Sequence, residues 1–158
     1  MKQNKLLQIF GAIIICQLAG IIGSFFTTPN IATWYAYLVK PVFSPPNWLF
    51  GPAWLTFYTL MGISLFLVWQ KILKDKKAKS AVILFLIHLF FNAIWSILFF
   101  GLHSPLLGLI DIILLLVLII IIIIKFYKIN NIAAYLLIPY LLWVSFATVL
   151  NLSIYLLN

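Results

Sequence analysis

The chain has 158 residues and a formal net charge of +8, yet only 8% of its residues are charged and 66% are hydrophobic. A water-soluble domain needs a charged surface, which ten lysines and two acidic residues cannot provide at this length. Composition therefore excludes a soluble globular protein and indicates an integral membrane protein, as does a mean hydropathy of +1.22.

Apolar runs long enough to cross the hydrocarbon core, which takes roughly 20 residues per helix, recur along the sequence. The runs do not alternate with polar residues, which favours helices over the strands of a membrane β-barrel. The sequence predicts an all-α fold, an integral membrane bundle of five transmembrane helices in a single membrane domain. The expected spans are 6–26, 47–69, 81–100, 106–124 and 132–156, with an outer loop at 27–46.

The first span is expected to be retained, because its apolar stretch is too long for a signal peptide and carries no plausible cleavage site. Small residues recur every fourth position along it, at Ala12, Cys16, Gly20 and Ser24. Such a stripe lets helices approach closely, either inside the bundle or across a dimer. Gln17, beside the stripe, is expected to form an interhelical hydrogen bond.

Lysines are distributed unequally between the two sides that five spans define. Nine fall on the side of the amino terminus and only Lys40 on the other, which predicts a cytoplasmic amino terminus and an outer carboxyl terminus. The nine are Lys2, Lys5, Lys71, Lys74, Lys76, Lys77, Lys79, Lys125 and Lys128. Arginine is absent, so we expect no nucleic-acid partner; anionic lipid binding by the lysines is the alternative to an orientation signal.

The second span follows "KPVFSPPNWLFGPAW", Lys40 to Trp54, which holds four of the seven prolines. Pro45 and Pro46 favour an extended backbone followed by a helix start, and Pro52 is expected to bend or loosen the first turns. Trp48 and Trp69 are about 30 Å apart along a helix, as expected for tryptophans at the two membrane interfaces.

Trp54, Tyr58 and Met61 share one face of the second span, where they either pack in the core or form a wall that binds a flat ring. On the third span His88, Asn92 and Trp95 form one stripe. An unpaired imidazole or amide in lipid costs several kcal/mol, so these side chains should face the bundle interior, as interhelical hydrogen bonds or as a site.

Asp111 is the one carboxylate within a span, and it is either a functional residue or a hydrogen-bonded anchor near the start of the fourth helix. The fifth span carries Tyr140, Trp143, Ala147 and Asn151 on one stripe. This stripe suits either a flat, partly polar ligand beside the small alanine or plain helix packing. Pro139 is expected to kink the helix.

Chemistry that needs paired acids, thiols or metal ligands has little support. One intramembrane carboxylate gives no acid–base pair and no metal site, and the single cysteine allows no intramolecular disulfide. No residue is firmly indicated as catalytic. The inward stripes instead predict an aromatic-lined, apolar pocket that opens on the outer side.

Several linked motifs resemble one known family. "WYAYLVKPVFSPPNWLFGPAW" with "FYTLMGISLFLVW", then "FNAIWSILFF" and "PYLLWVSFATVLN", are similar in order and spacing to the TspO/MBR family of translocator and tryptophan-rich sensory proteins. The resemblance covers essentially the whole chain, most strongly from Trp34 to Asn158. It implies a five-helix bundle, usually a homodimer in membrane lipid, that binds porphyrins of the protoporphyrin IX type and other flat hydrophobic ligands, with no obligatory cofactor.

The resemblance also implies a pocket at Trp54, Asn92, Trp143 and Ala147, beneath a lid that contains Trp34 and Tyr35. Together with the stripes, the complete set of expected ligand-binding residues is Trp34, Tyr35, Trp54, Tyr58, His88, Phe91, Asn92, Trp95, Trp143, Ala147 and Asn151, with Ser96 as a weaker addition. Two departures are His88, where the family often has Gln, and Tyr155, which lacks the following basic residue of a sterol-recognition pattern.

Three functions therefore remain open at the level of sequence. The first is a binding protein that transports, buffers or senses a tetrapyrrole. The second is an enzyme that degrades porphyrin in light, with Trp54 and Trp143 as the redox-active side chains. The third is a membrane interaction protein in which the polar stripes only join helices.

Overall fold

The structure is a computed structural model that describes residues 2–158, with side chains from residue 5. Five helical rods are long and apolar enough to cross a membrane, and no strand occurs in the described range, which confirms the all-α membrane bundle. The rods are α1 (Lys2–Ile31), α3 (Asn47–Trp69), α4 (Lys76–Ser96) with the π-helical η1 (Ile97–Gly101), α5 (Pro105–Tyr127), and α6 (Asn131–Leu136) with α7 (Ile138–Leu157). A short helix, α2 (Trp34–Tyr37), precedes α3.

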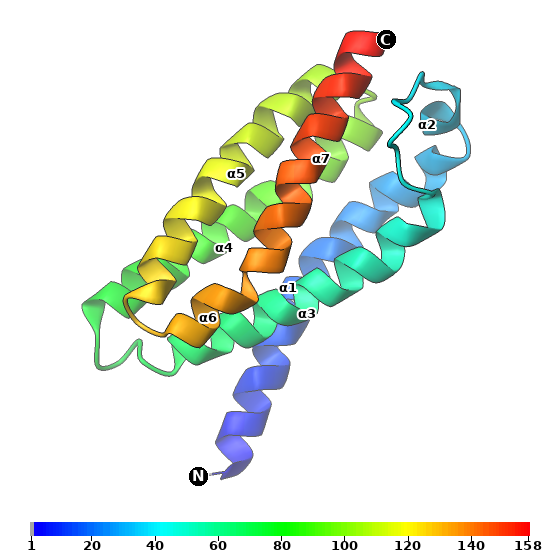
Figure 1. Ribbon diagram of the computed structural model, residues 1–158. Helices are drawn as coiled ribbons and strands as arrows, with labels where there is room; N and C mark the ends of the chain where they lie inside the picture. Colours follow the sequence, from blue (N-terminus) through cyan, green and yellow to red (C-terminus); the bar gives the residue numbers. More distant parts are fainter. Residues whose placement is uncertain (1) are drawn as a thin grey trace.

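The rods form a closed ring (Figure 1). α1 packs against α3 and α4, α5 packs against α4 and α7, and α3 completes the ring through α6. The two termini lie at opposite ends of the bundle, as an odd number of spans requires. This arrangement places α1, α3, α4 and α7 around a common space near the end that carries α2.

Three of the helices begin at residues whose side chains cap them. Asp75 accepts from the Lys77 amide before α4, Ser104 accepts from the Leu107 amide before α5, and Asn130 accepts from the Ala133 amide before α6. Each cap satisfies one amide that would otherwise lack a partner at a helix start. These capping residues, which are polar positions in an otherwise apolar sequence, therefore mark where the three helices begin.

Two helix boundaries depend on proline in different ways. α1 continues through Pro29 to Ile31, five residues beyond the expected end at Phe26, so the outer connection is shorter than expected and includes α2. In the last span the helix is interrupted at Leu137, and Pro139 lies in the first turn of α7. The missing amide of Pro139 is thus accommodated at a helix start, where no intrahelical bond is required.

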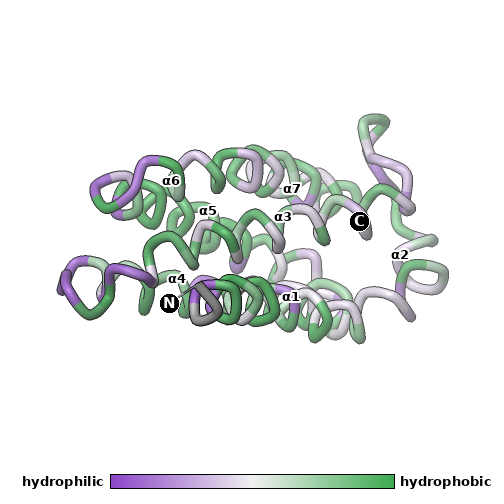
Figure 2. Tube along the Cα trace, turned by 90° about the horizontal axis from the view of Figure 1, so that it is seen from below, coloured by the Kyte–Doolittle hydropathy of each residue, from purple (hydrophilic) through white to green (hydrophobic). Residues whose placement is uncertain are grey.

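The polar loops gather at one end of the bundle, opposite α2 (Figure 2). The α3–α4 loop, with its lysines, meets the α5–α6 loop, because the Lys71 ammonium donates to the carbonyl of Ile129. We call this the lysine end, and the end that carries α2 the lid end. The side chain of Lys2 lies outside the described residues.

α1 and α3 touch most closely through small residues near the middle of the bundle. A Cβ on Gly62 would lie 2.5 Å from the Ile13 Cα, and a Cβ on Gly20 would lie 2.5 Å from the Tyr58 ring. Ala12 and Cys16 are fully buried, so the small stripe of α1 packs inside the bundle over these residues. The expected bond of Gln17 also forms: its amide donates to the Leu55 carbonyl and to Thr59 Oγ1, each at 3.0 Å.

Candidate functional site

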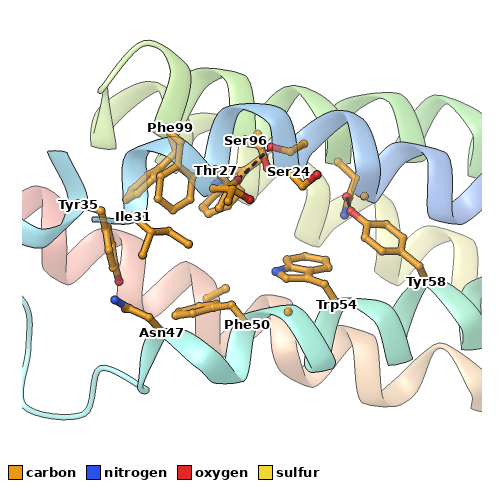
Figure 3. A pocket seen from close by; sticks show the side chains of 18 of the residues that line it. Ser24, Thr27, Ile31, Tyr35, Asn47, Phe50, Trp54, Tyr58, Ser96 and Phe99 are labelled. Atoms are coloured by element: carbon orange, nitrogen blue, oxygen red, sulfur yellow. Dashed lines mark hydrogen bonds between the residues drawn. The ribbon is translucent and has the colours of Figure 1, made fainter. Parts of the chain in front are cut away.

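A cavity of ≈ 320 Å³ lies in the lid-end half of the bundle, between α1, α3, α4 and α7. In Figure 3, Tyr35 and Tyr58 lie at opposite ends of it, and Phe50 and Trp54 lie along the α3 wall between them. Its volume is at the lower end of the range of about 300–1,000 Å³ usual for small-molecule pockets. No charged side chain lines it.

Most of the residues expected at a binding site line this cavity: Tyr35, Trp54, Tyr58, Asn92, Trp95, Ser96, Trp143, Ala147 and Asn151. Three do not. Trp34 packs edge-on against Phe99 of η1 with ring centroids 5.5 Å apart, His88 lies beneath the cavity floor, and Phe91 packs edge-on against Phe90 with ring centroids 5.7 Å apart. Helical periodicity gives a residue's face but not the level at which a cavity ends, so it selected His88 with Asn92 and Trp95, whereas Trp34 and Phe91 were expected from the family resemblance.

Trp54 and Tyr58 form the α3 wall as one aromatic surface. Their rings are stacked with centroids 5.4 Å apart and an interplanar angle of 28°. Gly20 of α1 permits this arrangement, because any larger residue would overlap the Tyr58 ring. Figure 3 shows the Trp54 indole nitrogen directed along the cavity towards Phe50, where a bound molecule could accept its hydrogen bond.

A chain of hydrogen bonds runs from the cavity floor into the core. The Tyr58 hydroxyl donates to Asn92 Oδ1, and Asn92 Nδ2 donates to the Tyr140 hydroxyl at 2.6 Å. The Tyr140 hydroxyl is in turn 3.0 Å from His88 Nε2. Three helices, α3, α4 and α7, are joined by this network, which satisfies polar groups that would be costly in lipid. His88 therefore influences the cavity only through Tyr140 and Asn92.

The α7 wall contains Trp143 and Ala147. Trp143 packs on Phe57 and Phe50 of α3, with ring centroids 5.5 and 6.0 Å apart, and these contacts close the seam between α3 and α7. Ala147 lies one turn further along the same face and lines the cavity. Its small side chain leaves room beside the indole for a flat ring.

Asn151 joins α7 to its neighbours at the next turn. Its Oδ1 accepts from the Trp95 indole at 3.2 Å, and its Nδ2 donates to the Pro105 carbonyl at 2.8 Å. Both polar ends of this buried amide are used, and Trp95 is held in one orientation. A Cβ on Gly108 would lie 3.1 Å from Asn151 Oδ1, so α5 approaches here only because that position is glycine.

The π-helical turn η1 contributes two aromatic residues that sequence reasoning missed. Phe99 and Phe100 are adjacent in sequence, yet both are buried and both contact Trp95, at 5.1 and 5.9 Å between ring centroids. An α-helix would direct adjacent side chains about 100° apart, whereas the wider π turn reduces this angle. No pattern in the local sequence predicts the π-helical turn.

Two interactions hold the lid at its opposite edges. On one side the His103 ring stacks on Trp34 at 4.8 Å, and His103 Nε2 is 2.8 Å from Asn30 Oδ1. On the other, the Asn158 side chain accepts from the Val39 amide at 2.9 Å and donates to the Val39 carbonyl at 3.0 Å. We call the second interaction the Asn158 clasp. Together they keep the lid over the cavity.

Tyr35 of α2 forms the underside of the lid, where it is 3% exposed and lines the cavity. Burial raises the pKa of its phenol above the usual range, so the hydroxyl stays neutral near pH 7. The Lys40 ammonium lies 4.8 Å from the centre of its ring and donates to the carbonyl of Leu38 at 3.1 Å. Among the lysines whose side chains the structure describes, Lys40 alone lies at the lid end.

Two buried side-chain polar atoms in the described chain have no hydrogen-bond partner, His88 Nδ1 and Asp111 Oδ2. Neither residue lines the cavity. Asp111 is 5% exposed on α5, which forms no part of the cavity wall, so this carboxyl is not a ligand-facing group.

The α1 wall was the other part of the site that sequence reasoning missed. Besides Ile21 and Ile31, the cavity-lining residues of α1 outside the stripe are polar or small, and they include Gly23, Thr27 and Thr28. A run of such residues in the outer half of an otherwise apolar span was a usable signal. Of these positions, only the stripe residues Gly20 and Ser24 were interpreted, as helix packing, while Thr27 and Thr28 were placed in the expected outer loop.

The chemistry available at the site is that of a neutral aromatic pocket. Hydroxyls, side-chain amides and indole N–H groups line the cavity, and several of them are already bonded to one another, while no acid–base pair of the described residues faces it. No cluster of metal-ligating residues occurs within the described chain. Such a site can bind and orient an apolar molecule.

Comparison with known proteins agrees with this architecture. The model of the TspO/MBR family matches residues 12–157. The chain belongs to the TspO/MBR family. Among its relatives, the tryptophan-rich protein TspO of Archaeoglobus fulgidus is 46% identical over 155 residues, covering 98% of this chain and 99% of the relative.

Similarity extends across bacteria and animals. A TspO protein of Chlorobaculum tepidum is 43% identical over 156 residues, with 98% of each chain covered. The human translocator protein is 34% identical over 140 residues, covering 88% of this chain and 83% of its own. Family membership and five apolar rods together make this TspO/MBR protein an integral membrane protein of a sensory or transport class.

Proposed function

We propose that this TspO/MBR protein binds a tetrapyrrole, or a similar flat hydrophobic molecule, in the cavity beneath α2. The observation that carries the proposal is the α3 wall of Trp54 and Tyr58, which lines an uncharged space together with Trp143 and the small Ala147 of α7. Flat apolar rings gain most from such surfaces, because stacking adds to the removal of apolar area from water. The name of the human relative, translocator protein, agrees with a role in moving a molecule.

The uncharged lining also suggests how a porphyrin would be oriented. Protoporphyrin carries two carboxylates on one edge, and a carboxylate inserted among aromatic rings without a partner would be costly. The carboxylate edge is therefore expected at the lid end, where Lys40 provides the one cation, and the apolar edge is expected towards Tyr58. The Trp54 indole would then lie along the macrocycle.

A titration of the purified protein in lipid nanodiscs with protoporphyrin, followed by tryptophan fluorescence, tests the proposal. We expect saturable quenching that Ala147→Phe weakens by about tenfold or more, because the ring fills the space beside Trp143. Val149→Phe is the matched control, since Val149 lies on the same helix with 54% exposure and faces away from the cavity. Linear quenching that is equal in all three proteins would mean partitioning into lipid and would refute the proposal.

The orientation of the ligand has a separate test. Lys40→Ala should weaken the binding of protoporphyrin by about three- to tenfold but leave its dimethyl ester unaffected, because only the free acid can pair with the ammonium. Equal loss for both compounds would mean that Lys40 acts through the fold of the lid.

The arrangement of lysines supports a direction in the membrane. The lysine end is proposed to face the cytoplasm and the lid end the outer side, since positive residues are retained on the cytoplasmic side. Labelling of single cysteines at Lys74 and at Val42 with a membrane-impermeant thiol reagent on whole cells checks this. Val42 is fully exposed near the lid, and only its cysteine should react.

A further inference from the structure

The cavity is not closed equally on its four sides. Of the residues that line it, those on α4 and α7 are mostly buried; Asn92, Phe99 and Asn151 are at most 4% exposed. On α1 and α3 several lining residues are exposed at the same time, and Ile21 and Leu55 reach 49% and 62%. A residue that both lines a cavity and is exposed lies at its opening.

The other seams between helices are filled by side chains. Phe50 and Phe57 close the seam between α3 and α7 by packing on Trp143. α1 and α4 are in close contact at Gly23, because a Cβ atom added there would lie only 2.8 Å from Ser96 Oγ. The seam between these two helices therefore leaves no opening at this point. Only the α1–α3 seam has exposed lining residues on both of its helices.

The shape of the opening follows from how α1 and α3 cross. They are in contact at Gly62 and again at Gly20, and the two hydrogen bonds of Gln17 mark the inner limit of the gap. Nearer the lid end, a Cβ atom added at the cavity-lining Gly51 would meet nothing within 4 Å, so the space beside α3 is open there. We call this gap the α1–α3 portal, bounded by Ile21 and Ser24 on α1 and by Gly51 and Leu55 on α3.

The depth of the portal decides what can reach it. Leu55 lies eight residues, or about 12 Å, along α3 from its start at Asn47, which is well inside a span of this length. The rim hydroxyl of Ser24 donates to the Ile21 carbonyl of its own helix at 2.7 Å, so it adds no unsatisfied polar group. Such a rim is compatible with lipid tails and offers little to water.

We propose that flat, neutral, membrane-dissolved molecules reach the cavity sideways from the bilayer through the α1–α3 portal, without opening of the lid. The lid meanwhile remains held by the Asn158 clasp and by the stack of His103 on Trp34. This inference depends on the cavity being a binding site, as proposed above, but the route can be tested without the natural ligand. The portal would also let a large ring bind, because part of the ring can extend between α1 and α3 beyond the cavity volume of ≈ 320 Å³.

The test uses a reporter thiol inside the cavity, Ala147→Cys, in a Cys16→Ala background that removes the native cysteine. Two maleimides are compared in nanodiscs: N-pyrenylmaleimide, which is flat and dissolves in lipid, and a charged, water-soluble maleimide. In both cases the thiolate sulfur adds to the maleimide double bond and the neighbouring carbon takes up a proton, so no other reactant is needed. We expect the lipid-dissolved reagent to label about tenfold faster or more.

Blocking the portal should then slow that reaction. Ser24→Phe on α1 and Leu55→Trp on α3 should each reduce the rate with N-pyrenylmaleimide by about fivefold or more. Ser153→Phe and Leu142→Trp are the matched controls and should leave it unchanged. Ser153 likewise bonds only to its own helix, at 2.9 Å to the Val149 carbonyl, and Leu142 is 65% exposed, close to the value for Leu55.

Two results would overturn the portal. One is an N-pyrenylmaleimide rate that both blocking variants leave unchanged. The other is faster labelling by the charged reagent, accelerated further by Asn158→Ala, which would mean that access is from water beneath the lid. Failure of protoporphyrin to bind the wild-type protein would refute the proposed ligand and leave the labelling rates free to decide the route.

Discussion

The contact of α1 with α3 at Gly62 allows a quantitative prediction from a single methyl group. In Gly62→Ala the new Cβ would lie 2.5 Å from the Ile13 Cα and 2.9 Å from the Ile13 amide nitrogen. Both atoms are backbone, so no side-chain rotation relieves the overlap. Ordinary carbon contacts are about 3.5–4.0 Å, and the helices must therefore separate by roughly 1 Å at this point.

Overpacking of this kind usually costs about 1–3 kcal/mol. Against it stands the gain of about 0.5–1 kcal/mol when alanine replaces glycine within a helix. Gly11→Ala provides the comparison, because its new Cβ would meet nothing within 4 Å. This substitution therefore has the favourable helix contribution of alanine without any steric cost. The difference between the two variants, about 1–3 kcal/mol, is the cost of the contact.

The measurement is thermal unfolding of both variants and the wild type in one detergent, followed by circular dichroism. For a chain of this size 1 kcal/mol corresponds to roughly 2–4 °C, so the midpoint of Gly62→Ala should lie about 2–12 °C below that of Gly11→Ala. Gly11→Ala should equal or exceed the wild type. A Gly62→Ala variant as stable as Gly11→Ala would refute the close α1–α3 crossing, and with it the argument that the helices diverge from this point.

Two further predictions concern polar groups. Tyr140→Phe should lower the free energy of unfolding by about 1–3 kcal/mol, because it removes the hydroxyl that bonds to both the Asn92 amide and His88. The control is Tyr155→Phe, at a side chain that is 41% exposed, which should change the free energy of unfolding by less than about 0.5 kcal/mol. Equal effects of the two substitutions would contradict the network. Asn158→Ala should speed hydrogen exchange at the Val39 amide by about tenfold, measured by mass spectrometry of the lid peptide, since one bond of about 1 kcal/mol or more is removed. Unchanged exchange there would mean that the clasp does not hold the lid.

Much of the site was predictable because a membrane simplifies the problem. A side-chain amide or indole N–H within a span is costly in lipid unless it is paired, so the stripes of Asn92, Trp143 and Asn151 were expected to point inward wherever the helices lay. Helical periodicity then placed Trp54 and Tyr58 on one face, and the structure stacks them. The interruption before Pro139 followed in the same way from a missing backbone donor.

Other features depended on contacts between distant segments. Phe99 and Phe100 share a face only because the chain widens into a π turn where it meets Trp95 and Trp34. The position of His88 was misjudged, since its stripe is correct but the cavity ends one layer above it, at Asn92 and Tyr58. Likewise Gly20, assigned to packing, both packs on Tyr58 and lines the cavity.

The sequence by itself determined the class of protein, the number of spans and the inward faces of the helices, because lipid penalises unpaired polar groups in the same way along the chain. Only the tertiary structure decided where the helices touch and where they part. That depends on the fit of single residues such as Gly62 against the Ile13 backbone, a steric condition between segments 49 positions apart that no local pattern records. The cavity and its portal are consequences of that fit.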